Sequence, residues 1–229
     1  MPDLTFEVEG AGAVPYAASP LIALKLRVAN AEAGELIQTI MLRCQIQIEA
    51  TRRRYEPGEQ ERLRDLFGEP QRWGRTLRPM LWTNASVVVP TFTGSTTVDL
   101  QVPCTFDFNV AATKYFAGLE GGEIPLNLLF SGTVFYQEGG GGLQVAQVPW
   151  EKEAVYRLPV GVWREMMDAY YPNTAWLCLR RDAFERLYRY KVRRGIPTWE
   201  QVLEALVPET EGPASHGEAE RPGAEGMVN

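Results

Sequence analysis

The sequence contains very little histidine and cysteine. Its single histidine, His216, lies among Gly, Pro and Glu residues near the end of the 229-residue chain. A Ser-His-Asp triad, a Cys-His pair or a histidine metal site would need a histidine in the folded body. The cysteines Cys44, Cys104 and Cys178 are far apart, and no pair has CxxC spacing. The sequence therefore predicts buried or reduced intracellular thiols, no metal site and no cofactor.

Long apolar runs and a secretory signal are also missing. No stretch approaches the roughly 18 apolar residues that a transmembrane helix needs. The N-terminal MPDLTFEVEG is acidic and alternating, whereas a signal peptide has a basic segment followed by an apolar one. We therefore expect a cytoplasmic protein with no membrane insertion.

The net charge of −6 is unevenly distributed. After Val207 the chain holds five glutamates and one arginine, which leaves a body of only −2. That balance argues against a general polyanion binder, and so against nucleic acid as the partner.

Alternation of apolar and polar residues dominates the chain up to residue 158. The clearest runs are 22–28, 40–48, 98–110 and 124–136. Each would bury one face and expose the other, as antiparallel sheets do. Pro103 cannot donate to a strand ladder, so its strand should be at an edge or bulged. We predict an α+β fold in which residues 1–159 form a mainly antiparallel domain of about seven or eight strands, as a sandwich or a strongly curved sheet.

Helical periodicity takes over after the last expected strand. VGVWREMMDAYY, DAFERLYRYKVRR and WEQVLEAL each fit a helix, with Asp182 and Thr198 as N-caps and Gly195 as a C-terminal stop. We expect residues 160–207 to form a three-helix segment packed on the sheet in the same domain. Residues 208–229 have the composition of a disordered acidic tail.

FGEPQRWGRTLRPMLW, residues 67–82, closes an expected crossing loop of about residues 51–82. Arginine stacks on indole and pairs with carboxylates, so Trp73, Arg75, Arg78 and Trp82 could bind a protein partner. Equally, Arg/Trp stacks could hold the loop against the sheet edge. Both interpretations stay open.

The expected helix at 182–194 is the second candidate surface. Phe184, Leu187, Tyr188 and Val192 share an apolar face. Arg186, Arg189 and Arg193 lie elsewhere on the helix, within a segment that carries about +5. A DNA- or RNA-binding helix would be basic in this way. Because the chain is acidic overall, we favour a solvated face or a dock for an acidic partner or for the tail.

An enzyme on a β scaffold is the alternative. It would use Asp107, Asp168 or Cys178 with backbone donors, but these residues are isolated in the sequence. No catalytic residue is assigned, and we favour a non-enzymatic protein.

Five stretches together carry a resemblance to a known family: FGEPQRWGRTLRPMLW, PCTFDFNVAATKYF, GEIPLNLLFSGTVFY, VPWEKEAVYRLPVGVWREMMDAYYPNTAW and LYRYKVRRGIPTWEQ. Over residues 3–207 the chain resembles the uncharacterised bacterial family named DUF6084. The resemblance implies a gene context of nickel-iron hydrogenase clusters, and hence an accessory protein that assists the assembly or function of such a hydrogenase. The implied partner is a hydrogenase subunit or maturation factor. The shortage of Cys and His argues against direct metal delivery.

A looser resemblance is to the SecB-type export chaperone. Long antiparallel strands are followed by YYPN and by helices with an RRGIP break. It implies an alternative architecture, a curved sheet with packed helices, and an alternative function as a chaperone-like client-binding protein.

Overall fold

The structure is a computed structural model that describes residues 2–32, 34–105, 110–137, 141–174, 177 and 179–207. The chain divides into two compact units, residues 1–175 and 176–229. In the described residues, the first unit contains two antiparallel sheets and helices up to α5, and the second contains α6 and α7.

The smaller sheet has three strands in the order β1-β2-β5. They are β1 (Leu4–Ala13), β2 (Leu21–Asn30) and β5 (Ser95–Pro103). β5 pairs only with β2 in this sheet, and the exposed Pro103 lies opposite Leu21 at its end. The expectation that Pro103 belongs to an edge strand is therefore confirmed.

The larger sheet has five strands in the order β4-β3-β6-β7, with β8 also paired to β6. They are β3 (Leu36–Ile48), β4 (Met80–Val89), β6 (Glu123–Gln137), β7 (Leu143–Gln147) and β8 (Glu153–Pro159). Gly132 of β6 has φ 152°, and a Cβ there would lie 2.2 Å from the Met41 carbonyl oxygen. The close approach of β3 and β6 therefore requires glycine at this position.

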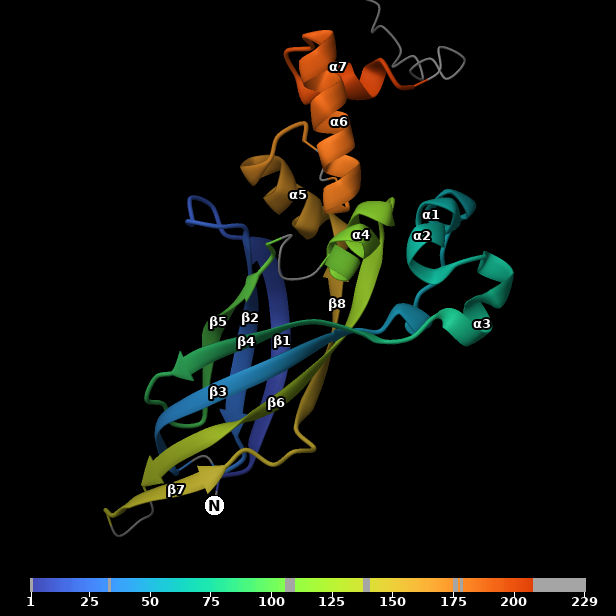
Figure 1. Cartoon of the computed structure of the whole chain (residues 1–229). Helices are drawn as coiled ribbons and strands as arrows, with labels where there is room; N and C mark the ends of the chain where they lie inside the picture. Colours follow the sequence, from blue (N-terminus) through green and yellow to red (C-terminus); the bar gives the residue numbers. More distant parts are fainter. Residues whose placement is uncertain are drawn as a thin grey trace, which may run out of the picture. The chain divides into compact units, whose positions relative to one another are not determined.

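The core lies between the two sheets (Figure 1). Alternate residues of each strand point inward, and the rings of Phe6 and Phe130 stack across the gap with centroids 4.3 Å apart. Cys44 and Cys104 are buried in this core, where burial raises the pKa of each thiol to about 12. The predicted α+β fold, with eight mainly antiparallel strands, is confirmed.

Between β3 and β4 the chain leaves the sheet for short helical turns, which we call the crossing segment, residues 49–79. It contains η1 (Ala50–Arg52), α1 (Pro57–Arg62), α2 (Arg64–Phe67), η2 (Pro70–Arg72) and α3 (Trp73–Thr76). Figure 1 shows these turns gathered beside one end of the larger sheet.

α4 (Val110–Gly118) and α5 (Val160–Tyr170) complete the first unit. The expected strand over 98–110 was too long, because β5 ends at Pro103 and Val110 already begins α4. Residues 106–109 lie outside the described residues. Tyr115 and Phe116 of α4 are both buried. Tertiary packing here outweighs the local alternation of apolar and polar residues that predicts a strand.

The second unit contains α6 (Arg181–Arg194) and α7 (Trp199–Glu204). Gly195 ends α6 in the left-handed conformation, and the Thr198 hydroxyl accepts a bond from the Gln201 N–H at 3.2 Å, both as predicted. Asp182 is not the N-cap. It lies in the first turn, where its charge still favours the helix dipole.

The packing of residues 160–207 on the sheet as one segment stays a prediction. The tail, residues 208–229, lies outside the described residues. Among the helices that the structure describes, none has the length and hydropathy needed to cross a membrane.

Candidate functional site

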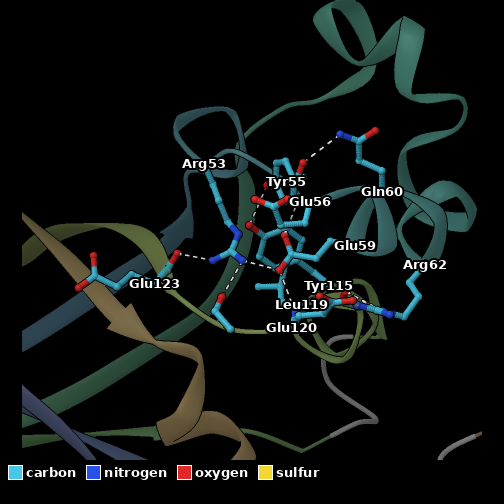
Figure 2. Close-up of polar contacts among 12 residues, drawn as sticks. Arg53, Tyr55, Glu56, Glu59, Gln60, Arg62, Tyr115, Leu119, Glu120 and Glu123 are labelled. Carbon is cyan, nitrogen blue, oxygen red and sulfur yellow. Dashed lines mark hydrogen bonds and ion pairs between the residues drawn. The ribbon is translucent and has the colours of Figure 1, made fainter.

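A buried ion pair fastens the crossing segment to the start of β6. Nη2 of Arg53 lies 2.6 Å from Oε1 of Glu59, and the two side chains are only 9% and 2% exposed. Nη2 also donates to the Gly121 carbonyl at 2.7 Å, and Nη1 donates to the Glu123 carbonyl at 2.6 Å (Figure 2). One side chain therefore ties α1 to the turn that precedes β6.

Glu59 accepts two further hydrogen bonds from the backbone. The N–H of Glu120 lies 2.8 Å from Oε1, and the N–H of Glu56 lies 3.1 Å from Oε2 as part of a capping box. Burial alone would raise the pKa of Glu59. The two N–H groups and Arg53 outweigh that effect and hold the pKa below its ordinary value. The carboxylate is therefore ionised at neutral pH.

Two tyrosines lie beside this ion pair. The Tyr55 hydroxyl donates to the Ala50 carbonyl at 2.7 Å, so the Tyr115 hydroxyl, 2.8 Å away, must donate to Tyr55. Burial is the main cause that raises the pKa of both phenols, that of Tyr115 to about 12, so both stay neutral. We call Arg53, Tyr55, Glu59 and Tyr115 the Arg53 cluster.

Arg53 and Glu59 of the Arg53 cluster line a surface groove of about 770 Å³. The rim of the groove is formed by three further arginines and three further glutamates, Arg52, Arg54, Arg157, Glu56, Glu120 and Glu123. Because arginines and glutamates are equally numerous around the groove, its charge favours neither an anionic nor a cationic ligand. Within the described residues, no group of three or more Cys, His, Asp or Glu side chains could hold a metal ion. We therefore interpret the cluster as a structural fastening.

Both tryptophans of residues 67–82, Trp73 in α3 and Trp82 in β4, point toward the protein. Trp82 is 4% exposed, and its ring lies edge-on to Phe116 with centroids 4.9 Å apart. Trp73 is half-buried, packs edge-on to Tyr55 and Phe67, and donates from Nε1 to the Gly68 carbonyl at 2.9 Å. These contacts favour the structural interpretation of the two indoles.

Arg75 and Arg78 differ from the tryptophans because both are exposed. Nη1 of Arg78 donates to the Leu77 carbonyl at 3.3 Å, and neither arginine has an ion-pair partner in the described part of the chain. Their guanidinium groups are thus available to a carboxylate. A binding role for these two arginines stays a prediction.

α6 presents an apolar stripe to solvent. Phe184, Tyr188 and Val192 follow one another at four-residue intervals and are 45%, 53% and 61% exposed. The rings of Phe184 and Tyr188 lie 5.2 and 6.4 Å from that of Trp199, which joins α7 to α6. Lys191 donates to the carbonyls of Ile196 and Pro197 and so helps to hold the turn between the helices.

Arg186, Arg189 and Arg193 form a basic row beside this stripe. All three are exposed, and together with Tyr188 and Val192 they line a surface hollow on α6. Arg186 lies 3.9 Å from Asp182, which leaves most of its charge uncompensated at this exposure. Apolar and basic side chains therefore share one exposed surface, which we call the α6 surface.

Of the three residues suggested for an enzyme, the structure describes one. Asp168 is exposed on α5, whereas Asp107 and Cys178 lie outside the described residues. The enzymatic alternative thus stays a prediction.

The pairing of Arg53 with Glu59 was not predicted. TRRRYEPGEQ shows three consecutive arginines and a glutamate after proline, but nothing in it tells which arginine turns inward. That choice depends on the carbonyls of Gly121 and Glu123, which are distant in sequence.

A family model described as a family of unknown function, DUF6084, matches residues 1–215. Among curated proteins, none matches the chain in sequence. A solved structure from Bordetella pertussis, provisionally named the ApaA protein, matches with 14% identity and a TM-score of 0.24, over 69% of this chain and 95% of that one. At that TM-score the likeness adds nothing about the fold or function of this chain.

Proposed function

The chain belongs to the DUF6084 family, whose function is unknown, and we propose that it is a non-enzymatic accessory protein that binds an acidic protein partner. The observation that supports this proposal is the α6 surface. Three exposed apolar side chains at helical spacing lie beside Arg186, Arg189 and Arg193.

The chemistry of the α6 surface defines the partner. Phe184, Tyr188 and Val192 suit apolar residues on one side of a helix or loop. The neighbouring arginines suit Asp and Glu side chains, because guanidinium groups form paired hydrogen bonds with carboxylates. An acidic amphipathic segment of a protein satisfies both requirements, whereas nucleic acid would leave the apolar stripe unused.

The hydrogenase context implied by the sequence resemblance makes one class of partner the first to test. We propose a subunit or maturation factor of a nickel-iron hydrogenase, with the protein assisting its assembly or function. Arg75 and Arg78 in the crossing segment form a second candidate contact, because both are exposed and lack an ion-pair partner in the described residues.

Binding can be measured by titration calorimetry between the full chain and purified hydrogenase subunits and maturation factors. Arg189→Glu should weaken binding by about tenfold or more, as expected when one charge of a complementary interface is reversed. Arg194→Glu is the matched control, because it makes the same charge change on the same helix outside the hollow. Equal losses in both variants would show a general charge effect and contradict the proposed surface.

Tyr188→Ala tests the apolar half of the α6 surface. It should also weaken binding, with α6 still folded by circular dichroism, because the exposed ring would lose its contact with the partner. If the wild-type chain instead binds anionic lipid vesicles and none of the purified proteins, the basic amphipathic helix is a membrane-surface element and the protein partner is excluded.

A further inference from the structure

The outer face of the three-stranded sheet has the charges of a solvated surface. Arg27 on β2 lies 3.7 Å from Glu7 and 3.8 Å from Glu9 on β1. Lys25 lies opposite Asp99 on β5. Acidic and basic side chains thus face each other across the strands, as they do on sheet faces that remain in water.

The outer face of the five-stranded sheet differs sharply. On β3, β4, β7 and residues 127–137 of β6, Arg43 is the one charged side chain among the described outward positions. The other charged side chains of this face, Glu123, Glu153 and Arg157, lie where β8 pairs with β6. Met41 and Val88 lie opposite each other and are 57% and 65% exposed. Leu143 and Val145 on the short strand β7 are 60% and 57% exposed. Most of the remaining outward positions of this sheet carry uncharged amide, hydroxyl or apolar side chains.

We infer that the outer face of the five-stranded sheet docks on the same face of a second copy of this chain. An exposed apolar region framed by polar side chains is typical of a protein interface. The chain carries a net charge of −6, which opposes self-association in general. Away from β8, this face carries almost no charge that would repel a second copy.

The placement of its few charges favours a second copy over an unrelated partner. Arg43 on β3 pairs with Ser131 of β6, and Glu153 on β8 pairs with Leu129 of β6 from the other side. A two-fold axis along β6 exchanges the flanking strands. Arg43 of each copy then lies two residue positions, or about 7 Å along the strand, from the partner's Glu153, and the long arginine side chain can span that offset. Arg43 has no ion-pair partner in the described residues, and Asn127 holds Glu153 in place at 3.1 Å.

The face is also large enough for a stable dimer. The five strands contain 50 residues. At about 3.3 Å per residue along a strand and about 4.8 Å between strands, each residue covers about 16 Å², so the face covers about 800 Å² on each copy. This matches the area of about 800 Å² per partner that stable protein complexes bury.

The test is sedimentation velocity of the full chain over a concentration series from micromolar to submillimolar. The wild-type protein should change from monomer to dimer. Arg43→Glu and Glu153→Arg should each weaken self-association by about tenfold or more, because each places like charges across the interface. The double variant restores both pairs with reversed sign and should recover most of the affinity. A wild-type chain that stays monomeric, or a double variant no better than the singles, would overturn the inference.

A control variant on the three-stranded sheet distinguishes an effect at the proposed face from an effect of net charge alone. Lys25→Glu makes the same charge change as Arg43→Glu on the outer face of the three-stranded sheet and should leave the dimer unchanged. Met41→Lys should weaken the dimer without lowering the melting temperature measured at micromolar concentration, where the chain is monomeric, because Met41 is exposed in the single copy. If a monomeric wild-type chain instead binds a reduced, unfolded protein, and Met41→Lys abolishes that binding, the face is a client-binding surface and the second copy is excluded.

Discussion

Nη2 of Arg53 and Oε1 of Glu59 are 2.6 Å apart, and both side chains are almost fully enclosed by protein. Removing one member of such a pair leaves the other charge buried without compensation. We therefore expect Glu59→Gln to lower the free energy of unfolding by about 3–5 kcal/mol. Urea unfolding followed by tryptophan fluorescence measures this loss.

The exposed pair of Arg157 and Glu123 provides the control for that experiment. These side chains are 63% and 53% exposed and lie 3.9 Å apart, at the groove that Arg53 and Glu59 also line. Arg157→Ala should change the free energy of unfolding by less than about 1 kcal/mol. Similar losses in the two variants would mean that the Arg53 pair is no more important than a surface pair.

The lowered pKa of Glu59 predicts how stability responds to acid. A carboxyl group whose pKa is lower in the folded than in the unfolded state stabilises the fold above the unfolded value. That contribution disappears as the pH falls through the folded value. Since the ordinary value is 4.5, the stability difference between wild type and Glu59→Gln should be constant at neutral pH and shrink below pH 4.5. The urea midpoints of both proteins, measured over this pH range, give the difference. A difference that stays constant below pH 4.5 would show that Glu59 does not titrate in this way.

Replacing the tryptophans and replacing the arginines of residues 67–82 should have different effects on stability. Trp82→Ala empties a buried position and should cost about 3–5 kcal/mol of unfolding free energy. The double variant Arg75→Ala/Arg78→Ala changes only exposed side chains and should stay within about 0.5 kcal/mol of wild type. Thermal melting distinguishes the two outcomes.

Partner binding by the double variant then decides whether Arg75 and Arg78 contact a protein. Weaker binding at an unchanged melting temperature would support a contact. A large fall in melting temperature with binding intact would show that the arginines, like the indoles, hold the crossing segment in place.

Much of the fold was predictable because alternation is a local property. The pattern in β3, with Ile40, Leu42, Cys44 and Ile46 inward, follows directly from the two-residue repeat of a strand. Which strands share a sheet was not predictable, because β3 pairs with β6 across many intervening residues. The end of β5 was misjudged for the same reason, since the helical state of Val110 depends on distant packing.

The candidate surfaces were predictable only in part. Helical spacing correctly placed Phe184, Tyr188 and Val192 on one side of α6, but it could not tell whether that side is exposed. Within residues 67–82, alternating Arg and Trp gave no sign that Trp82 is buried while Arg75 is exposed. Burial depends on contacts such as that with Phe116, which come from elsewhere in the chain.

The acidic tail gives a prediction that depends on its sequence alone. Residues 208–229 carry five glutamates and one arginine, with Pro and Gly throughout and no apolar periodicity. Such a segment cannot bury enough apolar surface to offset the entropy lost on ordering. Deleting residues 209–229 should therefore leave the melting temperature unchanged within error.

The same deletion tests whether the tail competes for the α6 surface. Its glutamates could meet Arg186, Arg189 and Arg193 only through weak attraction that salt screens. If α6 binds an acidic partner, the truncated chain should bind that partner equally well or slightly better, and the gain should be largest at low salt. Calorimetry at two salt concentrations measures this difference. A truncated chain that melts much earlier or precipitates would show that the tail packs on the folded body, so that the folded region extends beyond Val207.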